Sequence, residues 1–541
     1  MTPDSVEGVR GPGRWGSGFG ALPLAGIAGG LVGLLLLPPV QGGAGRLGVG
    51  ILALAGLAFA AGALLRSRDR LEAARAGFLV AGISSLLALH WVPAAMAPWW
   101  GSGAGLLAGI TLWSLHGVVG SLAYLAMAGL AHRVPTLLRF AAGWLVVERF
   151  PALLPLLPLP RPEMAALLVD APGLAASVPL LGGSVVVALW AGVVAVGVEA
   201  FRGGDPGAPR SGGGSRGRGS LAPVGAGLVA VVLLLLPLVE RGLDSAADPG
   251  SEEVLRLVVA ELPLERAALV DAHLRRERVE AGVEAVGAAH LWPEALLAEV
   301  DRIPEGLREP DGPPETGAWI GVHREEEGRR YNAVVHRSAG GTLETVHRKH
   351  RLVPGVERTR IRRPGLPGRG LAPGPPPEPF PVGPRMGGAL ICFEVLFPAL
   401  VGRLRKEGAT LLLHLGNDTM LQPGGSLPNL RDSARRQQDG LLGLRALEMR
   451  MPIVRSAMGG RSGGWDRRGR PLPVEVGAPG LDGAGPRTLE IRVPEAGAIP
   501  PAAHLGDLPV WIAALLLGAG LVGRRRMGGP DGPGEAVGPG R

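Results

Sequence analysis

Seven apolar segments, each about as long as a membrane-spanning helix, follow one another in the first 240 residues of this chain. They lie near residues 21–40, 47–65, 76–97, 104–131, 137–158, 175–200 and 221–239, and an eighth covers 508–523. A helix of about 20 apolar residues crosses a bilayer, and a water-soluble protein could not bury so many of them. With 47% hydrophobic and 19% charged residues, the chain is predicted to be a multi-pass membrane protein.

The charges between the segments predict how the chain is oriented in the membrane. Arginine gathers after the second, fourth and sixth segments, whereas the connectors at 41–46, 98–103 and 159–174 carry at most one arginine each. The connector after the second segment holds Arg66, Arg68, Arg70 and Arg75. Positively charged loops stay on the cytoplasmic side. We therefore expect both termini in the cytoplasm and the region between the seventh and eighth segments on the outer side.

Residues 241–507 form a large polar region that is predicted to fold as a separate α/β domain. Strand candidates lie at 255–262, 318–324, 331–337, 389–392 and 410–416, and residues 264–287 and 440–451 look helical. Alternating strands and helices favour a layered α/β fold. The domains predicted are a membrane domain with seven helices at 1–240, the α/β domain at 241–507, and a helix with a basic cytoplasmic tail at 508–541. Within the α/β domain, the Pro-, Gly- and Arg-rich stretch 361–384 is predicted to be a surface loop.

The net charge of +8 comes almost entirely from arginine, because Lys349 and Lys406 are the only lysines. The arginines are spread over loops and form no basic patch interleaved with aromatic residues. A nucleic-acid partner is therefore not expected.

The only cysteine of the chain, Cys392, follows the short apolar run 387–391. A nucleophile at the C-terminal end of a strand, on a sharp turn, is a common way to present a reactive atom. The competing interpretation is a buried cysteine that packs as a small hydrophobe. Glu294 and Lys349 lie in other short motifs of the same domain. A carboxylate base, an ammonium and a thiol together suit acyl transfer through a thioester.

The motifs around these residues resemble the carbon–nitrogen hydrolase (nitrilase) superfamily. They are WPE at 292–294, K-x-x-LVP at 349–354 followed by Glu357, ICFE at 391–394, GND at 416–418 and RALEMRMPIVRS at 445–456. Eight spans with such a domain before the last one resemble the membrane branch of that superfamily, the apolipoprotein N-acyltransferase family. The segment GWLVVERF at 143–150 is similar to a W-x-x-x-E helix of this family. Two family tyrosines are replaced, by His347 before the lysine and by Phe393 after the cysteine.

The resemblance implies an αββα sandwich domain and a role for each residue of the motifs. Glu294 would be the general base, Lys349 the stabiliser of the oxyanion and Cys392 the nucleophile. The supporting residues would be Glu357, Phe393, Glu394 and Asn417. No metal and no organic cofactor are implied.

The resemblance also implies the substrates and the location. A membrane phospholipid would donate an acyl chain, and the N-terminal amine of a diacylglyceryl-cysteine apolipoprotein would accept it. The protein would lie in the bacterial inner membrane with its catalytic domain on the periplasmic side. Two alternatives stay open: a membrane-tethered amidase acting on a small soluble amide, and a non-enzymatic protein, either a degenerate family member or a transporter with an outer binding domain. Seven spans exceed what an anchor needs, and the complete Glu, Lys and Cys set argues against degeneration.

Overall fold

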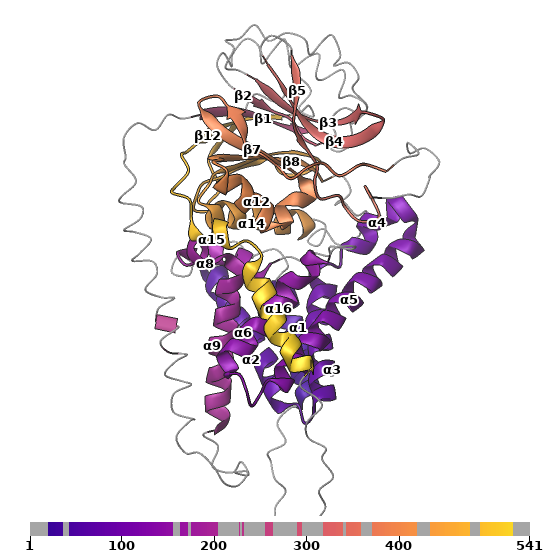
Figure 1. The fold of residues 1–541 in the computed structure, drawn as a ribbon, viewed down its shortest axis with the longest axis vertical. Coiled ribbons are helices and arrows are strands. Elements are labelled where there is room, and N and C mark those ends of the chain that lie inside the picture. Colours follow the sequence, from indigo (N-terminus) through magenta and orange to yellow (C-terminus); the bar gives the residue numbers. More distant parts are fainter. Residues whose placement is uncertain are drawn as a thin grey trace, which may run out of the picture.

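The computed structural model describes residues 20–35, 43–154, 163–170, 175–203, 227, 230–231, 255–262, 289–294, 317–338, 342–358, 370–418, 433–476 and 487–522. An N-terminal helical region lies beneath a domain built on a β-sheet, and the C-terminal helix α16 (Leu508–Val522) returns to the helical region (Figure 1). The predicted apolar segment 221–239 and the basic tail lie outside the described residues, apart from three single positions in the former.

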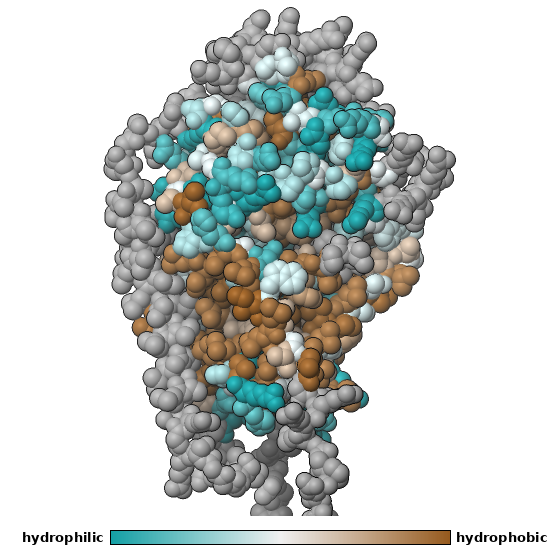
Figure 2. Space-filling view, viewed as in Figure 1, coloured by the Kyte–Doolittle hydropathy of each residue, from teal (hydrophilic) through white to brown (hydrophobic). Residues whose placement is uncertain are grey.

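Four helices of the described part are long and apolar enough to cross a membrane. They are α2 (Gly43–Arg66), α3 (Arg70–Ala88), α5 (Ser102–Gly129) and α9 (Gly183–Gly203). In α2, the apolar span begins at Val49. Two shorter apolar helices, α1 (Ala21–Leu35) and α16, pack beside them. In Figure 2 the visible surface of this region is a hydrophobic band below a largely hydrophilic domain. The helical region is therefore suited to a bilayer, while the predicted total of eight spans stays a prediction.

The helices differ from the predicted segments at several of their ends. The third segment is broken, because α3 ends at Ala88 and α4 (Val92–Trp100) begins anew with Pro93 in its first turn. Proline lacks the N–H that a continuous helix would need at that point. Arg70 and Arg75, predicted in a connector, lie within α3, whose first turn is capped by the side chain of Asp69.

The fifth and sixth segments also change direction within the predicted range. Helix α6 (Thr136–Arg149) passes into the 3-10 helix η1 (Phe150–Leu153) at Pro151. The 3-10 helix η2 (Met164–Asp170) and the short helix α8 (Val178–Leu181) precede α9. Helix α6 is not uniformly apolar, since it ends in the buried side chains of Glu148 and Arg149.

Close packing of α3 against α5 shows how small residues hold the helical region together. A Cβ atom added to Gly77 would lie 2.3 Å from the carbonyl oxygen of Gly120, and one added to Gly120 would lie 2.3 Å from that of Gly77. Only glycine at both positions lets the two backbones come this close, as is common where membrane helices cross.

The domain contains one connected sheet in the order β5-β4-β3-β2-β1-β9-β8-β7-β6. These strands are β1 (Leu255–Leu262), β2 (Ala289–Leu291), β3 (Ala318–Glu326), β4 (Arg329–Arg337), β5 (Leu343–Arg348), β6 (Phe380–Val382), β7 (Arg385–Ile391), β8 (Leu411–Asn417) and β9 (Ile453–Met458). Three further strands lie outside this order: β10 (Gly463–Trp465), β11 (Val474–Val476) and β12 (Arg487–Val493). Strand β10 pairs with β9, β11 pairs with β12, and β12 also pairs with β1. The pairs β1–β2, β2–β3, β1–β9, β7–β8 and β8–β9 are parallel, so the C-terminal ends of these strands share an edge of the sheet.

Two apolar cores position this edge. One contains side chains from both halves of the sheet, such as Leu257 and Trp319 from one half and Ile391 and Leu413 from the other. The second lies between β7–β9 and the helices α12 (Pro398–Lys406) and α14 (Ser433–Met449), which separate the sheet from the membrane helices in Figure 1. A short helix α15 (Pro501–Leu505) leads into α16. The layered α/β domain is thus present, whereas the complete αββα sandwich stays a prediction.

The predicted strands agree well with the observed ones, with two differences. Residues 255–262 form β1 as predicted, and 389–392 is the C-terminal part of a longer strand, β7. The predicted surface loop 361–384 is wrong at its end, because Phe380–Val382 forms the edge strand β6 against β7. Pro381 is tolerated there because an edge strand can lack one N–H donor. The predicted helix 264–287 lies outside the described residues.

Candidate active site

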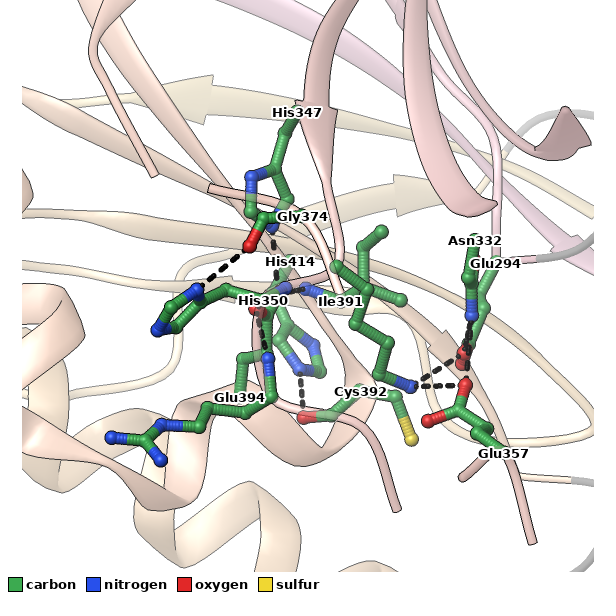
Figure 3. Close-up of polar contacts among 12 residues, drawn as sticks. Glu294, Asn332, His347, His350, Glu357, Gly374, Ile391, Cys392, Glu394 and His414 are labelled. Carbon is green, nitrogen blue, oxygen red and sulfur yellow. Dashed lines mark hydrogen bonds and ion pairs between the residues drawn. The ribbon is translucent and has the colours of Figure 1, made fainter. Parts of the chain in front are cut away.

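Cys392 lies directly after β7, where the chain turns into the 3-10 helix η5 (Cys392–Leu396). Its φ angle of +50° is in the left-handed region, a conformation that costs about 1–3 kcal/mol and persists only where the surroundings hold it. Two neighbours do so: His414 Nε2 donates to the Cys392 carbonyl at 3.1 Å, and the Glu394 carboxylate accepts from the Ile391 N–H at 2.8 Å. The sulfur of Cys392 faces Glu294 and Glu357 (Figure 3).

Three charged side chains lie in direct contact beside the sulfur: Glu294, Lys349 and Glu357. Glu294 follows β2 and Lys349 follows β5, so two strand ends carry them to the same edge. Lys349 Nζ lies 3.0 Å from Glu294 Oε1 and 2.8 Å from Glu357 Oε1. Asn332 Nδ2 from β4 donates to the same two oxygens at 2.7 and 3.1 Å. Lys349 is 1% exposed, so the ammonium is held almost entirely by these carboxylates.

Glu394 has a different position from the other two glutamates. It is fully buried and accepts hydrogen bonds from His347 Nε2, the His350 N–H and the Arg351 N–H, as well as from Ile391. It therefore ties the turn after β7 to the loop after β5. Since Lys349 begins this loop and Cys392 begins the turn, Glu394 fixes the distance between the two elements.

The charges at this edge have clear effects on protonation. Burial opposes the ammonium of Lys349, but Glu294 and Glu357 outweigh it and raise its pKa well above the usual value. Burial raises the pKa of Glu294, an effect that Lys349 only partly offsets. Burial, together with the charge of Glu294, raises the pKa of the Cys392 thiol far above its usual value. The Lys349 ammonium offsets this rise of the thiol pKa only in part, so the resting site favours a thiol whose proton a base must remove.

The two remaining predicted site residues differ in what surrounds them. The ring of Phe393 packs edge-on against Phe397, with centroids 5.3 Å apart, and joins the core beneath η5. Asn417 ends β8 and is half-buried. Their substrate-binding roles stay predictions. Among the described residues, no group of three or more His, Cys, Asp or Glu side chains is arranged to hold a metal ion.

Sequence reasoning missed several polar residues that surround this edge. His414 on β8 is fully buried, and burial together with Arg455 lowers its pKa to about 3, so it is neutral and donates from Nε2. Arg455 on β9 donates to both oxygens of the buried Asp418, at 2.7 and 2.6 Å. The motifs GND and RALEMRMPIVRS contain Asp418 and Arg455, but nothing in them indicates that the two side chains pair.

Comparisons with known proteins agree with this picture. Residues 316–472 match the carbon–nitrogen hydrolase family, a range that includes Lys349, Glu357, Cys392 and Glu394 but not Glu294. The chain is 30% identical over 153 residues to the apolipoprotein N-acyltransferase of Caulobacter vibrioides, covering 28% of this chain and 26% of that protein. It is 28% identical over 130 residues to apolipoprotein N-acyltransferase 1 of Leptospira interrogans, covering 24% of this chain and 20% of that protein.

The match thus spans about a fifth to a quarter of the length of these relatives. Among solved structures, an amidase from Nesterenkonia is 18% identical with a TM-score of 0.31, covering 46% of this chain and 92% of that one. A carbon–nitrogen hydrolase from Helicobacter pylori is 12% identical with a TM-score of 0.33, covering 44% and 89%. The family match and the two relatives confirm the resemblance that the motifs predicted.

Proposed function

Because the chain carries a carbon–nitrogen hydrolase domain and is similar to apolipoprotein N-acyltransferases, we propose that it transfers an acyl chain from a phospholipid to the N-terminal amine of a lipoprotein. The observation that carries the proposal is the buried Glu294–Lys349 pair facing the thiol of Cys392, in a domain that packs on apolar, membrane-type helices.

In the first step, Glu294 takes the proton of the Cys392 thiol, and the sulfur attacks the ester carbonyl of the phospholipid. The oxygen of that carbonyl becomes an oxyanion, which the ammonium of Lys349 stabilises. The C–O bond of the ester then breaks. The leaving alcohol takes the proton from Glu294, so a lysophospholipid departs and a thioester remains on Cys392.

In the second step, the free α-amino group of a diacylglyceryl-cysteine attacks the thioester carbonyl. Glu294 accepts a proton from the amine and returns it to the sulfur as the C–S bond breaks. The products are an amide and the original thiol. Glu357 holds Lys349 in place through its bond of 2.8 Å, and its other oxygen accepts the Val353 N–H at 2.8 Å.

The experiment that tests this proposal is mass spectrometry of the purified protein after incubation with phospholipid vesicles. We expect an added acyl mass on the peptide that contains Cys392, its release by hydroxylamine, and its absence in Cys392→Ala. A second incubation with a diacylglyceryl-cysteine peptide should move that mass onto the peptide amine. Folded protein that hydrolyses small soluble amides but takes no acyl group from phospholipid would instead establish the tethered amidase.

A further inference from the structure

Two sequence motifs that the proposed chemistry does not use meet at the junction of the helical region and the domain. One is the end of GWLVVERF, with Arg149 on α6, and the other is the start of RALEMRMPIVRS, with Arg445 and Glu448 on α14. Glu163, directly before η2, lies between them. Arg149 Nη1 lies 2.7 Å from Glu163 Oε1, and Arg445 pairs with both Glu163 and Glu448.

This ionic cluster, which consists of Arg149, Glu163, Arg445 and Glu448, is shielded from solvent. Each of the four side chains is at most 4% exposed. Helix α9 completes it, because the Gly183 N–H donates to Glu448 at 2.7 Å and the Ser184 hydroxyl donates to Glu163 at 3.1 Å. Breaking a buried pair by removing one partner typically costs about 3–5 kcal/mol, since a buried charge is left uncompensated. The four charges therefore hold each other in one arrangement.

The ionic cluster ends on the backbone of η5, three and four residues after Cys392. Arg445 Nε donates to the carbonyl of Val395 at 3.1 Å, and Arg149 Nη1 approaches the carbonyl of Leu396 at 3.4 Å. Both carbonyls belong to η5, whose first residue is Cys392. One guanidinium comes from the domain itself, but the other comes from the helical region, 247 residues earlier in the chain.

We infer that Arg149 and Glu163 are positioning residues that set the location of η5 and thereby the placement of the Cys392 sulfur against its base. The left-handed conformation of Cys392 makes η5 sensitive to the loss of such support, because a strained turn persists only where its surroundings hold it. The helical region then determines the reactivity of the nucleophile in addition to holding the domain at the membrane. The inference rests on the proposed function only in taking Cys392 as the nucleophile.

The test uses alkylation of Cys392 by iodoacetamide in the full-length protein in detergent micelles. Because the chain has one cysteine, total thiol labelling reports on this residue alone. In the wild type we expect a slow reaction at pH 8, since the site raises the pKa of the thiol. In Arg149→Gln and Glu163→Gln we expect η5 to loosen and the half-buried thiol to become more exposed to water. Labelling then accelerates by at most about tenfold for each unit by which the thiol pKa falls, because the thiolate fraction rises while its nucleophilicity falls, and the pH profile moves to lower pH.

Matched variants separate positioning from general loss of structure. Arg403→Gln removes a guanidinium from the exposed Arg403–Glu407 pair on α12, and it should label like the wild type. Arg149→Lys keeps a cation beside Glu163 while giving up the bond to Leu396, so its profile should lie between those of the wild type and Arg149→Gln. If Arg149→Gln does not fold, this lysine variant gives the decisive profile. All rates are measured well below the melting temperature of each variant.

The inference is overturned if folded Arg149→Lys and Glu163→Gln keep the wild-type labelling rate and pH profile, because the ionic cluster would then only join the two parts. Its failure is distinguishable from failure of the proposed function. Labelling responds to the position of the sulfur even if no phospholipid ever acylates Cys392, whereas acylation in the wild type does not depend on how these variants behave.

Discussion

At the scale of single residues, the site depends on one ammonium shared between two carboxylates. Lys349 Nζ reaches Glu294 and Glu357 with its compact head, and almost no solvent reaches it. A guanidinium is larger and planar and places its charge differently. The identity of this residue is therefore expected to matter more than its charge.

We predict that Lys349→Arg loses acylation of Cys392, although the charge is kept. Loss of one oxyanion donor typically costs about 10²- to 10³-fold in rate. The measurement is the rate at which the acyl adduct appears on the Cys392 peptide. Lys406→Arg, which changes the only other lysine at an exposed position at the end of α12, is the control and should react normally. Similar rates for the two variants would mean that Lys349 is a structural charge only.

A second prediction concerns the protonation of Glu294. A general base acts as the carboxylate, and burial raises the pKa of Glu294 above the ordinary 4.5. Acylation should therefore fall as pH falls through a value above 4.5, whereas an exposed glutamate would lose its charge only near that value. Rapid-quench measurement of adduct formation between pH 4 and 8 gives this profile. An acidic limb at or below 4.5 would show that another group is the base.

At the scale of elements, the site consists of strand ends joined by a buried carboxylate. The loop after β5 carries Lys349, the turn after β7 carries Cys392, and Glu394 accepts hydrogen bonds from both. Burial raises the pKa of Glu394, but the charge and hydrogen bonds of its partners, His347 first among them, bring the net value below 4.5. The ionised form is thus the one that the fold stabilises.

This leads to a prediction about stability and pH. A carboxyl whose folded pKa is lowered stabilises the fold above its unfolded pKa, and this stabilisation is lost as pH falls through the folded pKa. Glu394→Gln should therefore lower the melting temperature of the domain at pH 6, and the difference from the wild type should shrink below pH 4.5. Hydrogen bonds to a charged group contribute roughly 1.5–3 kcal/mol, and each kcal/mol corresponds to about 2–4 °C in a domain of this size.

Calorimetry of the detergent-solubilised protein measures this difference. Glu407→Gln, at an exposed glutamate that pairs with Arg403, serves as the control and should lower the melting temperature little at any pH. A gap for Glu394→Gln that stays constant from pH 6 to pH 3 would contradict the role of its ionised form.

At the scale of the whole molecule, an apolar helical region carries a polar domain that returns to it through α15 and α16. Large apolar side chains such as Leu107, Ile512 and Leu515 are more than half exposed on the helices, as lipid-facing side chains would be. The domain rests on this region through α14 and the ionic cluster around Glu163. Under the proposed function, we expect an acyl chain to reach the site from the side of the helical region.

The distribution of arginine predicts the orientation of this assembly. Reporter fusions after residues 205 and 300 should lie on opposite sides of the membrane, with 205 in the cytoplasm, because the loops rich in arginine stay inside. Alkaline phosphatase, active outside, and a fluorescent protein, active inside, give complementary readings. The same side for both positions would contradict the charge argument and, with it, a site that faces the outer leaflet.

The sequence by itself determined the features that a repeated apolar pattern or a short motif specifies. Apolar segments predicted the helical region, and β-branched and apolar runs predicted β1 and the end of β7. Three short motifs located Glu294, Lys349 and Cys392. Each of these signals is local in the sequence. One is a run of apolar residues long enough to cross a bilayer, and another is a short apolar strand that ends in a nucleophile.

Only the tertiary structure decided how distant residues meet. It showed that Asn332 and Lys349 share the same carboxylate oxygens, and that Glu394 joins two elements instead of facing the thiol. It also brought Arg445 to Glu163, 282 residues away. Such pairs leave no periodic pattern in either segment. A buried arginine and a solvated one look alike in a sequence, and only the packing around them decides which charges must pair.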